Sequence, residues 1–150
     1  MPQIEKDYIK TGKVKYVLLD FPIESIHKDA FKAHEAANCA GNQGRYWEMH
    51  DRLFAHQDAL GLVHLSDHAK AVGLDLRTFE ECLKSGKHEA EIRRNIAAGV
   101  EAGVRGTPTF FVGLTDPNDS KIKALEMIRG AQPYAQFKQA IDKLLATENR

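Results

Sequence analysis

Cysteine is scarce in this chain, which contains two among 150 residues. Cys39 and Cys82 are far apart in sequence, so they do not form a Cys-x-x-Cys redox motif. Two cysteines alone also do not make a zinc site, because such a site takes three or four protein ligands. The cysteine content therefore excludes the two commonest cysteine-based motifs of intracellular enzymes and small metal-binding domains.

A charge imbalance and a long hydrophobic run are also missing. Lysine and arginine together number 21, as do aspartate and glutamate, so no net field favours nucleic acid or an anionic membrane surface. No apolar stretch approaches the roughly 20 residues that a membrane-spanning helix needs. The first ten residues lack the apolar segment of a secretory signal. We therefore predict no nucleic-acid partner and no membrane span, and these residues alone leave the compartment unassigned.

The remaining composition is that of a globular α/β protein. Hydrophobic residues make up 43% and charged residues 28%, and 150 residues suit one domain with a sizeable core. Apolar periodicity and breaker residues predict the order helix, strand, helical block, strand, strand, helix. The predicted helices cover about residues 3–11, 29–42, 46–57, 66–72, 76–85, 87–102 and 133–146, and the predicted strands cover 13–21, 109–113 and 124–129.

Individual residues set several of these boundaries. Tyr16 to Leu19 is continuously apolar, which is typical of a strand buried on both faces. Ser66 and Asp75 are expected to cap the helices that follow them. The polar residues 115–121 are expected to form the long tip of an antiparallel hairpin.

The most informative stretch is Gly103-Val104-Arg105-Gly106-Thr107-Pro108-Thr109. Its glycines allow a sharp exit from the preceding helix, and a proline is tolerated at the first residue of a strand. A cis peptide before Pro108 would leave open backbone N–H and C=O groups over residues 105–107, with which an extended peptide could pair. We therefore assign substrate binding to Arg105, Gly106, Thr107 and Pro108. The alternative is that Pro108 only marks a loop-to-strand join.

Together with this stretch, several segments resemble DsbA-like thiol-disulfide oxidoreductases, which are thioredoxin-fold proteins with a helical insertion. They cover nearly all 150 residues. The resemblance implies a thioredoxin-like (DsbA-type) α/β fold as a single domain over 1–150. It places the helical insertion at about 29–102 and the cis-proline loop, hairpin and last helix at about 103–147. The segments are Gly12-Lys13-Val14, Asp20-Phe21-Pro22, His27, 35–40, 43–54, Gly73-Leu74-Asp75 and 79–83.

The chain departs from this family at its N-terminus. Family members begin with a strand and a helix whose first turn carries Cys-x-x-Cys, whereas this chain starts at a position equivalent to the middle or end of that helix. We therefore expect an N-terminally truncated domain with no catalytic residue of its own. The missing strand would lie between residues 14–21 and 109–113. Three arrangements would account for the gap that this strand leaves. The two exposed edges could pair directly, a second subunit could fill the gap in a homodimer, or the chain could be a fragment of a longer protein. We favour the fragment, stabilised as a dimer.

The resemblance also bears on the cysteines, because some family members carry a second, non-catalytic disulfide in the insertion. We expect Cys39 and Cys82 to form such a structural disulfide in an oxidising compartment, and two separate buried thiols remain the alternative. No cofactor and no metal are expected. His64 and His68 have i, i+4 spacing, but Ser66 is a predicted cap between them, and His50 and His56 are no better placed.

Three functions remain open at this point. The first is a DsbA-like oxidoreductase acting on cysteine-containing or extended polypeptides, inactive in exchange as written, with a periplasmic or extracytoplasmic setting implied by the family. The second is a redox-inactive thioredoxin-like module that binds peptides or proteins, also as a dimer. The third is a glutathione-using isomerase or transferase of the same superfamily, whose pattern the helix around Cys39 matches less well.

Overall fold

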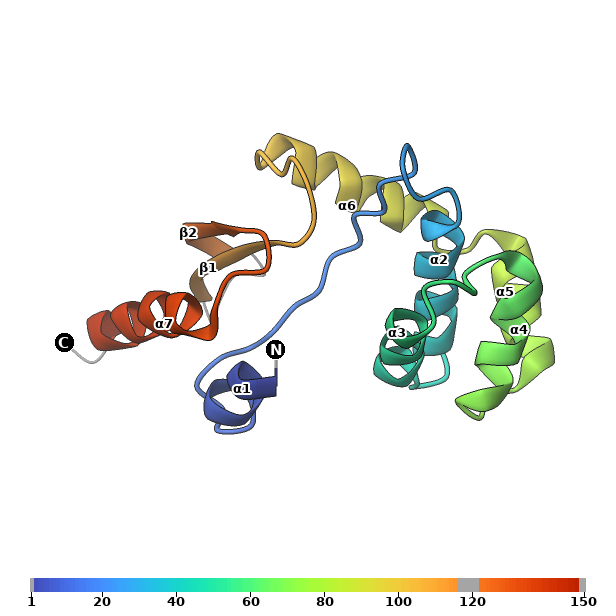
Figure 1. Ribbon diagram of the computed structural model, residues 1–150, viewed down its shortest axis with the longest axis horizontal. Helices are drawn as coiled ribbons and strands as arrows, with labels where there is room; N and C mark the ends of the chain where they lie inside the picture. The colour runs from blue at the N-terminus through green and yellow to red at the C-terminus, as the bar shows by residue number, and fades with distance from the viewer. Residues whose placement is uncertain (1, 116–121, 149–150) are drawn as a thin grey trace. The chain divides into compact units, whose positions relative to one another are not determined.

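The computed structural model describes residues 2–115 and 122–148 of the chain. The described residues form two compact units (Figure 1). One unit combines residues from 1–18 and 104–150, and the other is formed by residues 19–103. Among the helices described, none has the length and apolar character required to cross a membrane.

The unit of residues 19–103 is helical. Its helix α2 contacts each of the other four helices, so the unit is built around α2. The helical boundaries agree with most of the sequence predictions to within about four residues. The helices are α2 (Ala30–Gly41), α3 (Tyr46–Ala55), α4 (Leu62–Ala71), α5 (Leu76–Ser85) and α6 (Glu89–Glu101).

Small side chains on α2 allow its neighbours to approach closely. The alanines at positions 33, 36, 37 and 40 are all buried, and they pack with large side chains from the other helices. Met49, Leu65 and Phe79 are fully buried there. Burying each side chain of this size contributes about 1.5–3 kcal/mol to stability. The alanine face of α2 therefore fixes where the core of this unit lies.

Two helix boundaries show where local signals succeed and fail. Asp75 is the predicted cap of α5, and its Oδ1 accepts a hydrogen bond of 2.8 Å from the Thr78 backbone N–H. The predicted cap at Ser66 is wrong, because α4 begins at Leu62 and Ser66 lies inside it, donating to Glu80. Packing decides this boundary: the fully buried Leu65 lies in the turn before Ser66 and holds that turn in the helix.

The other unit contains a β-hairpin covered by helices. Strand β1 (Thr109–Thr115) pairs antiparallel with β2 (Ile122–Arg129), and α7 (Tyr134–Glu148) follows. The chain begins with α1 (Pro2–Ile4), which continues as a π-helical turn, η1 (Glu5–Ile9). The tip predicted at 115–121 lies largely outside the described residues. The core of this unit consists of Ile4, Tyr8, Ile128, Phe137, Ala140 and Ile141.

The predicted strand at 13–21 is not formed. Residues 14–23 have no regular secondary structure, and the sheet in the described part of the chain consists of β1 and β2 alone. An extended segment becomes a strand only when its N–H and C=O groups pair with a neighbouring strand. Among the described residues, the continuous apolar run at Tyr16 to Leu19 belongs to no strand of a sheet.

Gly113 occupies the irregular position of the hairpin, and its replacement should destabilise this unit. The β1–β2 register shifts between Val112 and Gly113, and a Cβ at Gly113 would overlap the Lys123 carbonyl oxygen. We expect Gly113→Ala to lower the free energy of unfolding by about 1–3 kcal/mol through this clash. Urea unfolding followed by circular dichroism measures the effect. Gly106→Ala is the matched control, because apart from its own residue and its two chain neighbours no atom lies within 4 Å of its added Cβ. Equal stability of the two variants would contradict the prediction.

Candidate functional site

The predicted substrate-binding loop joins α6 to β1. Gly103 adopts a positive φ of 82° at the end of α6, and the Thr107–Pro108 peptide bond is cis. Arg105, Thr107 and Pro108 are exposed, whereas Gly106 is half-buried. The four residues therefore form one accessible segment immediately before the first strand.

Carbonyl groups attach this loop to the hairpin. The Gly106 carbonyl accepts from the Thr109 hydroxyl at 2.7 Å, and the Pro108 carbonyl accepts from the Gly130 N–H at 2.8 Å. Among the described residues, the N–H groups of 105–107 make no backbone hydrogen bond. The carbonyl oxygens of the loop are therefore bonded to the hairpin, whereas the N–H groups of residues 105–107 remain able to donate to the backbone of another chain.

The cysteines lie in the helical unit and are bonded to each other. Cys39 of α2 and Cys82 of α5 form a disulfide with an S–S distance of 2.04 Å and a Cα–Cα distance of 5.9 Å. The predicted pairing is therefore present. A cross-link that closes a loop of 43 residues contributes about 3–4 kcal/mol to stability in the chain-entropy description. Since the chain contains only these two cysteines, neither is a free thiol in this state.

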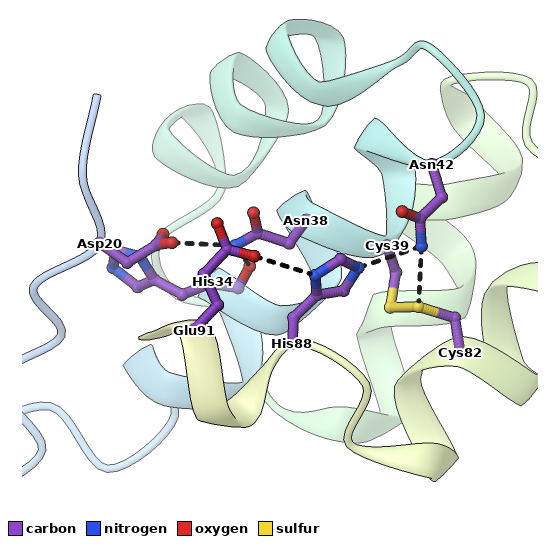
Figure 2. Close-up of polar contacts among 8 residues, drawn as sticks. All are labelled: Asp20, His34, Asn38, Cys39, Asn42, Cys82, His88 and Glu91. Carbon is purple, nitrogen blue, oxygen red and sulfur yellow. Dashed lines mark hydrogen bonds and ion pairs between the residues drawn. A yellow bond between two sulfur atoms is a disulfide. The ribbon is translucent and has the colours of Figure 1, made fainter. Parts of the chain in front are cut away.

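Polar residues that the sequence did not single out surround the exposed side of this disulfide (Figure 2). The Asn42 side-chain amide donates to the Cys82 sulfur at 3.3 Å, and it lies 3.0 Å from Nε2 of His88. The Nδ1 atom of His88 lies 3.8 Å from a carboxylate oxygen of Glu91. No spacing in the sequence reveals this group, because its members come from the end of α2, from α5 and from the start of α6. Only the folding of three helices against one another brings them together.

A second polar network lies along α2. The carboxylate of Asp20 is 6% exposed, and its two oxygens bind His34 Nδ1 at 2.7 Å and the Asn38 amide at 3.1 Å (Figure 2). Burial by itself would raise the pKa of Asp20. The hydrogen bonds from His34, Asn38 and Asn95 and the charge of His34 outweigh burial, so the pKa lies below its ordinary value.

The histidine pair considered in the sequence does not make a site. His64 is exposed, whereas His68 is buried and uses both ring nitrogens within the protein. The Arg52 side chain donates to Nδ1 of His68 at 3.1 Å, and Nε2 lies 2.8 Å from the Ala59 carbonyl. With both nitrogens hydrogen-bonded, His68 serves the packing of α3 against α4.

The fold and the comparisons with known proteins define the class of this chain. A family model described as thioredoxin matches residues 1–143. The chain therefore belongs to the thioredoxin family, and its α/β architecture is thioredoxin-like with a helical insertion. No solved structure shows a significant match.

Curated relatives carry the name Na(+)/H(+) antiporter. The chain is 39% identical over 111 residues to NhaA 3 of Salinispora tropica, covering 74% of this chain and 17% of that protein. It is 36% identical over 124 residues to NhaA 1 of Mycolicibacterium gilvum, covering 77% and 20%. It is 36% identical over 99 residues to NhaA of Herminiimonas arsenicoxydans, covering 66% and 16%. The chain therefore spans about a fifth or less of the length of these relatives.

The Asp20 network makes the stability of the helical unit dependent on pH. Because the folded-state pKa of Asp20 lies below its ordinary value of 3.8, its stabilising contribution is complete above pH 3.8 and is lost as the pH falls through the folded-state pKa. We expect Asp20→Asn to cost about 1–3 kcal/mol at pH 7, since a buried charged acceptor of two hydrogen bonds is removed. Urea unfolding between pH 2 and pH 7 measures both effects. The control is Asp67→Asn at an exposed position of α4. A wild-type profile that parallels the Asp20→Asn profile would contradict the assignment.

Proposed function

We propose that this chain is a DsbA-like member of the thioredoxin family that binds an extended polypeptide at Arg105, Gly106, Thr107 and Pro108. We further propose that the chain as given does not itself carry out thiol–disulfide exchange. The observation that supports the binding site is the accessible loop whose N–H groups are free of backbone hydrogen bonds among the described residues. The likeness to DsbA-type proteins rests on the order of the sequence segments and on the helical insertion.

Backbone pairing is the mode of recognition that this loop supports. An extended peptide laid beside residues 105–107 would accept hydrogen bonds from their N–H groups, as in the addition of a strand to a sheet edge. Such pairing uses main-chain groups and depends little on the partner's side chains, so it can bind unfolded or extended polypeptides of many sequences. Because β1 pairs on one edge only in the described sheet, the same argument supports a homodimer through its other edge.

The state of the cysteines supports the absence of exchange activity. Thiol–disulfide exchange of the thioredoxin type needs a low-pKa thiolate that attacks the substrate disulfide. Both sulfurs of this chain are bonded to each other, and Cys39 is only 2% exposed. A disulfide of this kind persists in oxidising compartments, which supports an extracytoplasmic setting.

The binding site is tested with a fluorescent, cysteine-free extended peptide. We expect saturable binding, and at least about tenfold weaker binding when a Thr107→Pro substitution deletes one loop N–H, since a lost hydrogen bond costs about 0.5–1.5 kcal/mol and the new ring adds a clash. Gly61→Ala, in the other unit, is the control. Circular dichroism establishes that each variant is folded.

The peptide itself supplies a test that does not depend on folding of a variant. A peptide with N-methyl groups on alternate residues keeps its side chains but crowds the carbonyls that would pair with the loop. We expect it to bind the unmodified protein at least about tenfold more weakly. Equal binding of the two peptides, or no binding of either, would refute the proposed site.

The absence of exchange is tested by the reduction of insulin with dithiothreitol. We expect the chain to leave the reduction rate unchanged, because no Cys-x-x-Cys thiolate is present. An acceleration that disappears in Cys82→Ser would refute this part of the proposal while leaving the peptide site untouched.

The relatives favour a second candidate, in which this stretch is an accessory domain of a longer protein with antiporter activity. The observation is that several relatives named as antiporters match over only 15–20% of their length. The mass of the native product, detected with an antibody against this chain, distinguishes the two. A species several times heavier than 16.8 kDa supports the accessory domain, and a species at that mass refutes it.

A further inference from the structure

Three potential metal ligands converge where α2, α5 and α6 meet. The Cys39 sulfur, the Cys82 sulfur and a ring nitrogen of His88 all lie within 4.8 Å of one another. Cys39 is buried, whereas Cys82 and His88 are half-buried. The group therefore lies at the border of the helical core, with Cys39 inside it and with Cys82 and His88 partly exposed. Figure 2 shows the three side chains beside one another.

The contacts of His88 determine which of its ring nitrogens carries the proton. The Asn42 NH2 group has no lone pair to offer, so Nε2 of His88 is the acceptor in their 3.0 Å contact. The proton of a neutral ring then resides on Nδ1, which faces the Glu91 carboxylate at 3.8 Å. A neutral imidazole with a carboxylate behind its protonated nitrogen is the usual form of a metal-binding histidine, and the Nε2 lone pair becomes available to a metal when the Asn42 amide turns away from it.

The oxidation state of the sulfurs decides whether a metal can bind. In the disulfide neither sulfur is a thiolate, which is the form of cysteine that binds a metal ion. A dithiol reductant supplies two electrons and two protons, becomes a disulfide itself, and leaves Cys39 and Cys82 as thiols. Binding of a divalent metal then releases both thiol protons.

We propose that the reduced protein binds one Zn²⁺ ion through Cys39, Cys82 and His88. Tetrahedral zinc with Zn–S distances of about 2.3 Å and a Zn–N distance of about 2.0 Å places its ligand atoms roughly 3.5–3.8 Å apart. The three ligand atoms already lie within 4.8 Å of one another, so they are close to these spacings once the sulfur–sulfur bond is broken. Water occupies the fourth position.

Neighbouring residues have defined roles at this site. The Asn42 amide already donates to the Cys82 sulfur and would stabilise the thiolate. Glu91 would orient the imidazole of His88 and increase its basicity. The inference is independent of the peptide site, because every residue it uses belongs to the helical unit and none lies in 105–108.

Cobalt is the spectroscopic probe for this test. The protein is reduced with dithiothreitol, freed of reductant by gel filtration without oxygen, and titrated with Co²⁺. We expect one equivalent to produce the absorption bands of tetrahedral, thiolate-bound cobalt, and Zn²⁺ to abolish them by displacement. The disulfide form should give no such bands. Absence of the bands from the reduced protein would overturn the proposal.

Variants identify the ligands. His88→Ala keeps both cysteines, and we expect its cobalt affinity to fall by more than about tenfold. His64→Ala is the matched control because His64 is exposed on α4, and its affinity should be unchanged. Cys82→Ser should abolish the thiolate bands. Unchanged affinity of a folded His88→Ala variant would overturn the role of His88, and retained bands in Cys82→Ser would overturn the site.

Discussion

The cross-link between α2 and α5 is the constraint on which the helical unit depends. The loop that it closes contains α3 and α4, so the bond restricts these two helices in the unfolded chain in addition to joining α2 to α5. The alanines of α2 provide little side-chain volume of their own, and the core of this unit therefore relies on the close approach of its neighbours. A covalent tie at Cys39 and Cys82 maintains that approach. Beside this bond, the Asn42 amide contacts both the Cys82 sulfur and the His88 ring.

The unit that contains the hairpin depends on its helices, because a two-stranded hairpin alone is only marginally stable in water. Helix α7 and the N-terminal turns cover one face of it with the apolar cluster around Phe137 and Ile128. Polar contacts complete the cover: the Tyr8 hydroxyl donates to Asp142 at 2.7 Å, and burial, followed by this hydrogen bond, raises the pKa of Tyr8. The loop of residues 105–108 is attached to this hairpin through the Thr109 and Gly130 contacts, so a peptide bound there would rest on a supported strand rather than on a free loop.

The parts of the structure that could be predicted from sequence are those decided by local chemistry. Asp75 forms its cap and Gly86 ends α5 with a φ of 63°, because each conformation is determined within one turn of chain. The segment at 13–21 was mispredicted because strand formation depends on a neighbour that the segment itself cannot supply. Ser66 was mispredicted because the packing of Leu65 outweighs a capping preference of about 1 kcal/mol. The cysteine pair was expected from family resemblance, whereas His88 beside it could not be found, since contacts among three helices leave no spacing signal.

The sulfurs of Cys39 and Cys82 can either bond to each other or bind a metal ion, but they cannot do both at once. As a disulfide they stabilise the fold by reducing the conformational entropy of the unfolded chain. As thiolates they could stabilise it by binding an ion that the unfolded chain binds poorly. Metal binding to the dithiol would oppose its reoxidation, and by linkage the disulfide would exclude the metal by the same free energy. An ion bound at this point would join α2 to α5 and also to the start of α6 through His88. The reduced protein would then keep its helices together by coordination where the oxidised protein does so by a covalent bond.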